Sequence, residues 1–196
     1  PVTYYNHFKP SDEVNIPRAY VIPQGWFNVI DLLKLNVVEM ERFENDTIIN
    51  VESYKINFFE TVKTPFEGHY MHYNTAIIKK SEQITFHAGD FLITTNQPAI
   101  RYLLETLEPQ APDSFFNWNF FDSILQQKEG FSPYVWEDLA FDLLKNNPEL
   151  KEIFEKKRNT EKDFANNWYV QLNWLYEQSD YYEKAHLQYP VYRITN

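Results

Sequence analysis

The sequence has no cysteine and only four glycines among its 196 residues. Without cysteine, the chain cannot form a disulfide framework, a thiolate zinc site, an iron–sulfur cluster or a thiol nucleophile. The glycines, at positions 25, 68, 89 and 130, lie far apart, whereas a phosphate-binding loop needs clustered glycines so that the backbone can approach the phosphate. Walker-type and dinucleotide-binding loops are therefore excluded.

Positive charge and long apolar runs are also scarce. The chain has 18 Lys and Arg residues against 28 Asp and Glu residues, which gives a net charge of −10. This balance argues against a nucleic acid partner, because Lys and Arg on phosphates supply most of that affinity. The one basic cluster, Lys156–Arg158, is expected to end a helix, where it complements the helix dipole. No apolar run approaches the ~20 residues of a membrane-spanning helix, so no membrane span is expected.

Hydrophobic residues make up 43% of the chain and aromatic residues 18%, a composition typical of a folded domain. We predict a single domain over residues 1–196 of the α+β class. In this prediction a mainly antiparallel sheet with one early helix, over residues 15–95, packs against a helical lobe over residues 96–190. The early helix follows from Trp26, Val29, Ile30 and Leu33, which recur at helical spacing.

Strands are predicted at residues 19–22, 37–43, 48–59 and 70–78, which are rich in β-branched and aromatic side chains. Within the last of these, His72, Asn74 and Ala76 are expected to share one face. Residues 84–86 and 91–94 are predicted to form a hairpin around Gly89 and Asp90.

The helical lobe is predicted from helical spacing and from capping residues. A first helix starts near Pro98 and ends at Pro109, and residues 108–113 are the expected hinge. Residues 114–126 are predicted as an aromatic-rich helix. Further helices begin at Ser132-Pro133 and at Asn147-Pro148, and the last one carries the apolar positions of residues 164–176.

Five aromatic residues crowd the predicted helix at 114–126: Phe115, Phe116, Trp118, Phe120 and Phe121. They would occupy every side of that helix, so either two lobes enclose it or part of it meets a partner. We select Phe115, Trp118 and Phe121 as candidate partner-binding residues. Trp118 is the first choice, because Trp buries a large area while its N–H still needs a partner. The alternative is a module that binds carbohydrate, peptidoglycan or peptide through its aromatic faces.

Three histidines, His69, His72 and His87, lie close in the sequence. Positions i and i+3 of a strand point to opposite faces, so His69 and His72 are poorly placed to share an ion. His72 and His87 could still meet across paired strands, which leaves a metal hydrolase as a third alternative. Neither His-Glu-x-x-His nor His-x-x-Glu occurs, and imidazoles with backbone partners are the favoured interpretation. We assign no catalytic residue, no metal ligand and no cofactor to this chain.

A series of short segments carries a family resemblance. Residues 17–26 read Pro-Arg-Ala-Tyr-Val-Ile-Pro-Gln-Gly-Trp, residues 29–35 read Val-Ile-Asp-Leu-Leu-Lys-Leu, and residues 38–43 read Val-Glu-Met-Glu-Arg-Phe. Later come Gly-Asp-Phe-Leu-Ile at 89–93, Gln-Pro-Ala at 97–99, Leu-Leu-Glu at 103–105, Leu-Glu-Pro at 107–109, Asp-Ser-Phe at 113–115, Trp118, Phe-Phe-Asp at 120–122 and Tyr-Pro-Val-Tyr-Arg at 189–193. In this order they resemble the region downstream of the catalytic domain in large bacterial zinc carboxypeptidases of the carboxypeptidase A type.

The resemblance implies an accessory role. In that family a His-x-x-Glu motif and a distant His hold the zinc, and a Glu is the general base. All of them lie in the preceding peptidase domain and have no match here. The resemblance therefore implies a C-terminal accessory domain that is not an enzyme on its own, whose partner is the peptidase domain of the same polypeptide. It also implies a secreted or periplasmic setting, although no signal segment is visible. Because the chain starts at Pro1 without methionine, we expect a processed product or a piece of a longer polypeptide.

Overall fold

The structure, a computed structural model, describes residues 2–7, 9, 13–127 and 130–195. In these residues it contains a six-stranded antiparallel sheet and six α-helices, which confirms the α+β class. The chain divides into two compact units. We call the part up to Ser123, together with the segment from Leu187 onward, the sheet unit, and residues Ile124–His186 the helical unit.

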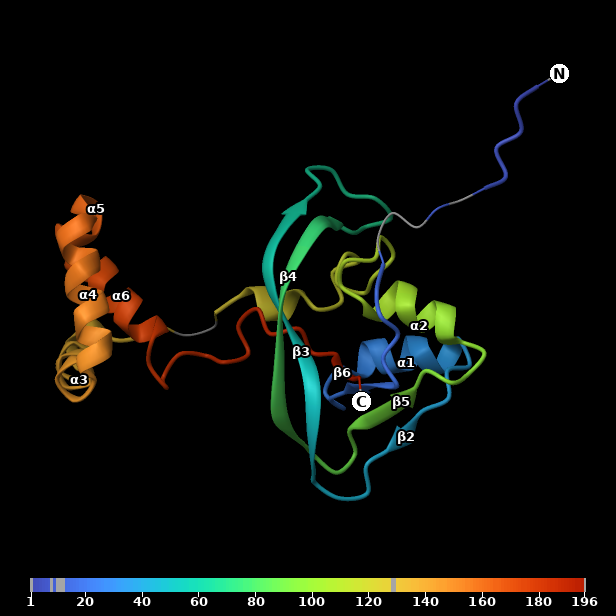
Figure 1. Cartoon of the computed structure of the whole chain (residues 1–196), viewed down its shortest axis with the longest axis horizontal. Helices are drawn as coiled ribbons and strands as arrows, with labels where there is room; N and C mark the ends of the chain where they lie inside the picture. Colours follow the sequence, from blue (N-terminus) through green and yellow to red (C-terminus); the bar gives the residue numbers. More distant parts are fainter. Residues whose placement is uncertain (1, 8, 10–12, 128–129, 196) are drawn as a thin grey trace. The chain divides into compact units, whose positions relative to one another are not determined.

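The sheet has the strand order β2-β5-β1-β6-β3-β4 (Figure 1). The strands are β1 (Ala19–Ile22), β2 (Glu41–Arg42), β3 (Thr47–Thr61), β4 (His72–Phe86), β5 (Phe91–Thr94) and β6 (Tyr192–Ile194). The short apolar strand β1 lies between β5 and β6 and is buried along its whole length. Strand β6, from the end of the chain, therefore joins the early strands to the long β3–β4 ribbon.

Strands β3 and β4 pair over almost their whole length, with irregularities near Phe58. Asn74 on β4 has a positive φ of 52°, and Asn tolerates this left-handed conformation better than most residues. The distorted backbone there breaks the alternation of faces that we predicted for residues 70–78. As a result, His72 and Thr75, three positions apart, are both buried, while Asn74 is exposed.

The predicted hairpin of residues 84–86 and 91–94 is wrong. Residues 84–86 belong to β4, which pairs with β3, whereas β5 pairs with β1 and β2. The carboxylate of Asp90 accepts hydrogen bonds from the backbone N–H groups of Gln24 and His87. These bonds hold the connection between β4 and β5 next to the residues that follow β1. Strand β5 therefore does not pair with β4. Of the strand predicted at 37–43, only Glu41 and Arg42 form β2.

Two helices belong to the sheet unit, α1 (Phe27–Leu35) and α2 (Ile100–Leu107). Helix α1 buries Val29, Ile30 and Leu33, as the helical spacing predicted. Helix α2 buries Leu103 and Leu107. No helix in the described part of the chain is both long enough and apolar enough to cross a membrane.

The aromatic-rich helix predicted at 114–126 is also wrong. Residues 115–121 form consecutive turns, and a short 3-10 helix follows at Asp122–Leu125. Ser114 Oγ accepts a hydrogen bond from the Asn117 backbone N–H, and the Asn117 side chain donates to the Ala111 carbonyl. Asn119 adopts a left-handed φ of 67°. Short polar side chains of this kind compete with helical hydrogen bonds and stabilise turns.

The boundary between the lobes differs from the prediction near residue 96. Residues 96–123 pack with the sheet: the Tyr20 hydroxyl donates to Glu108, and the His72 N–H donates to the Asn117 carbonyl. The hinge expected at 108–113 therefore lies inside the sheet unit. Such contacts join residues far apart in sequence, which local spacing does not report.

The helical unit contains α3 (Pro133–Asn146), α4 (Pro148–Thr160), α5 (Lys162–Ala165) and α6 (Trp168–Glu177). Pro133 opens α3, and the Asn147 side chain caps α4 by accepting from the Leu150 N–H, both as predicted. The Trp136 indole N–H donates to the Leu172 carbonyl at 2.9 Å. The core of this unit consists of Trp136, Ala140, Leu150, Phe154, Phe164, Leu172, Leu175 and Tyr176.

Candidate functional sites

The structure separates the three predicted partner-binding residues. Phe115 is 5% exposed and Phe121 is fully buried, so both side chains lie in the core of the sheet unit. Phe121 packs edge-on against Trp26 and Tyr189. Trp118 is partly exposed. Of the three, Trp118 is therefore the side chain that a partner could reach.

Trp118 belongs to a group of rings that we call the Trp118 cluster: Phe66, His69, Trp118 and Phe120. The His69 ring lies 5.4 Å from Trp118 and 6.1 Å from Phe120, and Phe66 lies 6.2 Å from Trp118. Phe66 and His69 come from the connection between β3 and β4, which therefore lies against the turns of residues 115–121. Phe66 is 59% exposed, so the cluster presents apolar surface to solvent.

A polar cavity of about 270 Å³ adjoins this cluster and is built around His72. The His72 side chain is 5% exposed, and both of its ring nitrogens are occupied. Nδ1 lies 2.9 Å from the Thr61 hydroxyl, and Nε2 lies 3.0 Å from Asp122 and 3.3 Å from Asn119 Nδ2. Asn119 also donates to the Tyr70 carbonyl. His72 thus links the end of β3, the start of β4 and residues 119–122 through its side chain.

The two histidines considered as metal ligands lie apart. His72 begins β4, and His87 directly follows its last residue, so the strand separates them by about 50 Å at ~3.3 Å per residue. His87 Nδ1 instead lies 3.1 Å from an Asp46 carboxylate oxygen. The alternative in which His72 and His87 share a metal ion is therefore wrong. In the described part of the chain, no group of three or more acidic or imidazole side chains is placed to hold a metal ion.

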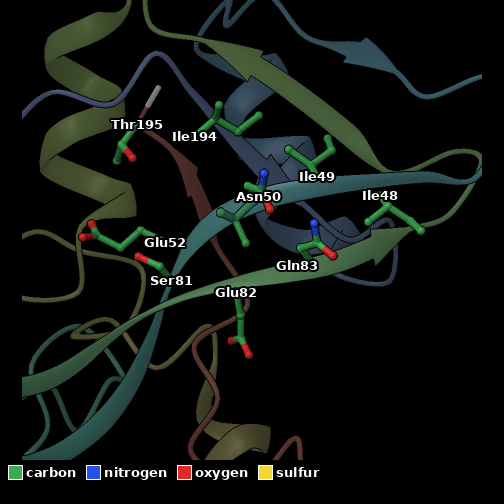
Figure 2. Close-up of a pocket in the computed structure, with 10 residues that line it drawn as sticks. Ile48, Ile49, Asn50, Glu52, Ser81, Glu82, Gln83, Ile194 and Thr195 are labelled. Atoms are coloured by element: carbon green, nitrogen blue, oxygen red, sulfur yellow. The ribbon is translucent and has the colours of Figure 1, made fainter.

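A larger groove of about 660 Å³ lies on the β3–β4 ribbon beside the end of β6 (Figure 2). Strand β3 contributes residues 48–52, β4 contributes residues 81–83, and Ile194 and Thr195 close one side. Asn50 pairs with Gln83, and Glu52 pairs with Ser81, across the two strands. Directly paired residues share a face of the sheet, so these four polar side chains form a common floor.

A buried ionic cluster lies next to this groove. The Arg193 guanidinium is 2% exposed and contacts Glu52, the Tyr54 hydroxyl and the Asn15 carbonyl. Its Nε lies 3.0 Å from Glu108, which accepts the Tyr20 hydroxyl at 2.6 Å. Burial lowers the pKa of Arg193, but Glu108, Tyr54 and Glu52 outweigh that effect and the net shift is upward. The guanidinium therefore stays charged and shared between two carboxylates.

The partners of Arg193 explain why the sequence did not reveal the cluster. Glu52 and Glu108 lie 141 and 85 positions away in the chain, as the residue numbers show. In the sequence, a buried Arg in a short C-terminal strand has the same neighbours as an Arg that is exposed to solvent. Only the pairing of β6 with both β1 and β3 identifies it as buried.

Comparison with known proteins gives a partial relationship. The chain is 30% identical over 100 residues to Carboxypeptidase 2 of Trichophyton tonsurans and, likewise, to Carboxypeptidase 2 of Trichophyton equinum. Each match covers 50% of this chain and 18% of the relative. No protein-family model matches the chain, and no solved structure matches it significantly. Half of this chain is thus similar to part of a carboxypeptidase, and the chain spans less than a fifth of the length of those relatives.

Proposed function

We propose that this chain is a non-catalytic accessory domain of a carboxypeptidase-like protein and that it packs against the peptidase domain of the same polypeptide. The observation that carries this proposal is the 100-residue similarity to Carboxypeptidase 2, which covers only 18% of each relative. A match of this extent fits one part of a larger enzyme. The downstream position and the secreted or periplasmic setting implied by the resemblance belong to the same proposal.

The residue types in the chain support a role without catalysis. The chain has no His-x-x-Glu motif, which the resembled family uses to hold its zinc. His72, the most buried imidazole of those considered, uses both ring nitrogens within the fold. In this arrangement His72 positions neighbouring side chains, and the chain contributes binding surface to the polypeptide.

The docking surface in this proposal is the Trp118 cluster. Exposed apolar rings beside a polar cavity match the anatomy of interface hot spots, in which Trp is enriched. The same combination of aromatic rings with Asp122 and Asn119 also favours a second function, the binding of a carbohydrate or peptidoglycan through the aromatic faces. A measurement on Trp118 distinguishes these two functions.

Binding between this chain and the separately produced peptidase domain tests the docking. Trp118→Ala is expected to weaken it about 30-fold, the loss typical of a hot-spot Trp of about 2 kcal/mol. Trp168→Ala is the matched control, because Trp168 is 60% exposed and lies in the helical unit. It should leave the affinity within about twofold. Titration calorimetry measures both variants.

Two results would contradict the docking. One is unfolding of the sheet unit by Trp118→Ala, which would make Trp118 a core residue. The other is unchanged affinity for the peptidase domain together with loss of a glycan-induced change in Trp fluorescence, which would favour the carbohydrate-binding function.

A further inference from the structure

The groove of Figure 2 lies where the sheet splits between β3 and β6. The two strands are paired at Glu52 and Arg193, and β6 then continues along β1 through Ile194. Residues 47–50 of β3 have β4 on one edge and, among the described residues, no strand on the other. The backbone groups on that edge are available to an added strand.

The floor of the groove carries unused hydrogen-bonding groups. In the part of the chain that the structure describes, the side chains of Asn50, Ser81 and Gln83 have no hydrogen-bond partner. The three residues are exposed and lie on the floor described above. Their amide and hydroxyl groups can therefore form hydrogen bonds to a ligand that is polar on the side facing the floor.

The charge at the groove is negative. Arg193 contributes one positive charge, which Glu52 and Glu108 share, so this cluster keeps an excess of one carboxylate. Glu108 is buried, whereas the Glu52 side chain is 23% exposed and lines the groove. Arg193 contacts Oε1 of Glu52, which leaves Oε2 for a ligand. The carboxylate charge that Arg193 does not neutralise therefore lies on Glu52, on the open side of the groove.

We propose that this groove binds an extended peptide as an added strand along residues 47–50 of β3, with a Lys or Arg side chain on the floor beside Asn50 and Glu52. A residue opposite Asn50 points to the same face and reaches Glu52 on the diagonal. The neighbouring peptide residues point to the other face, beside Ile49 and Ile194, which pack around buried Val51 and Phe86. The site therefore selects an alternating apolar–basic–apolar segment. It is independent of the proposed docking surface.

Three labelled seven-residue peptides test this site by fluorescence anisotropy. The first alternates Val and Thr around a central Lys, the second has Glu at the centre, and the third repeats the first with alternate backbone nitrogens methylated. The Lys peptide should bind, the Glu peptide should bind at least about tenfold more weakly, and methylation should abolish binding. Hydrogen exchange of amides within residues 47–50 should slow on binding of the Lys peptide.

Two variants localise the effect. Gln83→Lys places a positive charge on the floor and should weaken the Lys peptide about tenfold. Ile78→Lys is the control, because Ile78 lies on the same strand outside the groove and is 53% exposed. It should change the affinity for the Lys peptide by less than about twofold. Thermal unfolding verifies that both variants are folded. Absence of binding, equal affinity for the Lys and Glu peptides, tolerance of methylation, or protection elsewhere in the chain would each overturn the proposal.

Discussion

Arg193 and the residues around it are the part of the sheet unit in which burial away from water costs the most free energy. The Arg193 guanidinium, the Glu108 carboxylate and the hydroxyl groups of Tyr20 and Tyr54 are removed from water together, whereas Glu52 stays partly exposed. Such groups are tolerated only when each charge has partners, because an isolated buried charge is very costly. The cluster links β1, β3 and β6 with the residue that follows α2, and so defines the position of the last strand.

Three tyrosines in this region resist ionisation. Burial, followed by the charge of Glu108, raises the pKa of Tyr20, Tyr54 and Tyr189 above the ordinary value. In the unfolded chain these hydroxyls release protons near pH 10. Above that pH the folded chain binds more protons than the unfolded chain, so the free energy of unfolding falls as pH rises.

Tyr189→Phe tests this linkage. The Tyr189 hydroxyl donates to the Leu107 carbonyl at 2.8 Å, so its loss should cost about 1 kcal/mol at neutral pH. Between pH 10 and 11, the variant should lose stability less steeply than the wild type, by up to about 1.4 kcal/mol per pH unit. Urea titrations at several pH values measure the free energy of unfolding.

The control for this variant is Tyr134→Phe, at a side chain that is 89% exposed. It should change the neutral-pH stability by less than about 0.5 kcal/mol. Parallel pH dependences for the wild type and Tyr189→Phe above pH 10 would be inconsistent with a protonated, buried Tyr189.

Among the elements, those with strong local signals were predicted well. Strand β1 has the predicted bounds, Trp26 immediately precedes α1, and Pro133 and Asn147 begin α3 and α4 as expected. In each case neighbouring residues determine the element, through a run of apolar side chains, helical spacing or a capping side chain.

Elements that depend on distant partners were predicted poorly. Strand β5 pairs with β1 and β2, and the turns of residues 115–121 are stabilised by short side chains and by contacts to β4. The candidate sites follow the same pattern. Trp118 was selected from its residue type, whereas the groove depends on where β6 leaves β3, which no local spacing indicates.

Asn147→Ala tests the capping of α4. The Asn147 side chain accepts from the Leu150 N–H at 3.1 Å, and losing such a cap costs about 1 kcal/mol. Asn159→Ala makes the same substitution at an exposed position in the last turn of α4, away from this cap, and should change the stability by less than about 0.5 kcal/mol. Amide hydrogen exchange in α4 measures both effects. Equal effects of the two variants would argue against a specific cap.

At the scale of the whole molecule, the chain is a sheet unit with a helical unit inserted after Ser123. The sheet unit closes only when the segment from Leu187 onward returns and adds β6. The Trp118 cluster, the His72 cavity and the groove all lie in the sheet unit. The helical unit has its own aromatic core. The proposed functions therefore concern the sheet unit.

We propose that this chain assists a carboxypeptidase without catalysing the reaction itself. The most direct measurement incubates the purified chain with zinc and a peptide that has a free C-terminus, and follows release of the C-terminal residue by mass spectrometry. We predict no release with or without zinc. Zinc-dependent release that a chelator abolishes would contradict it.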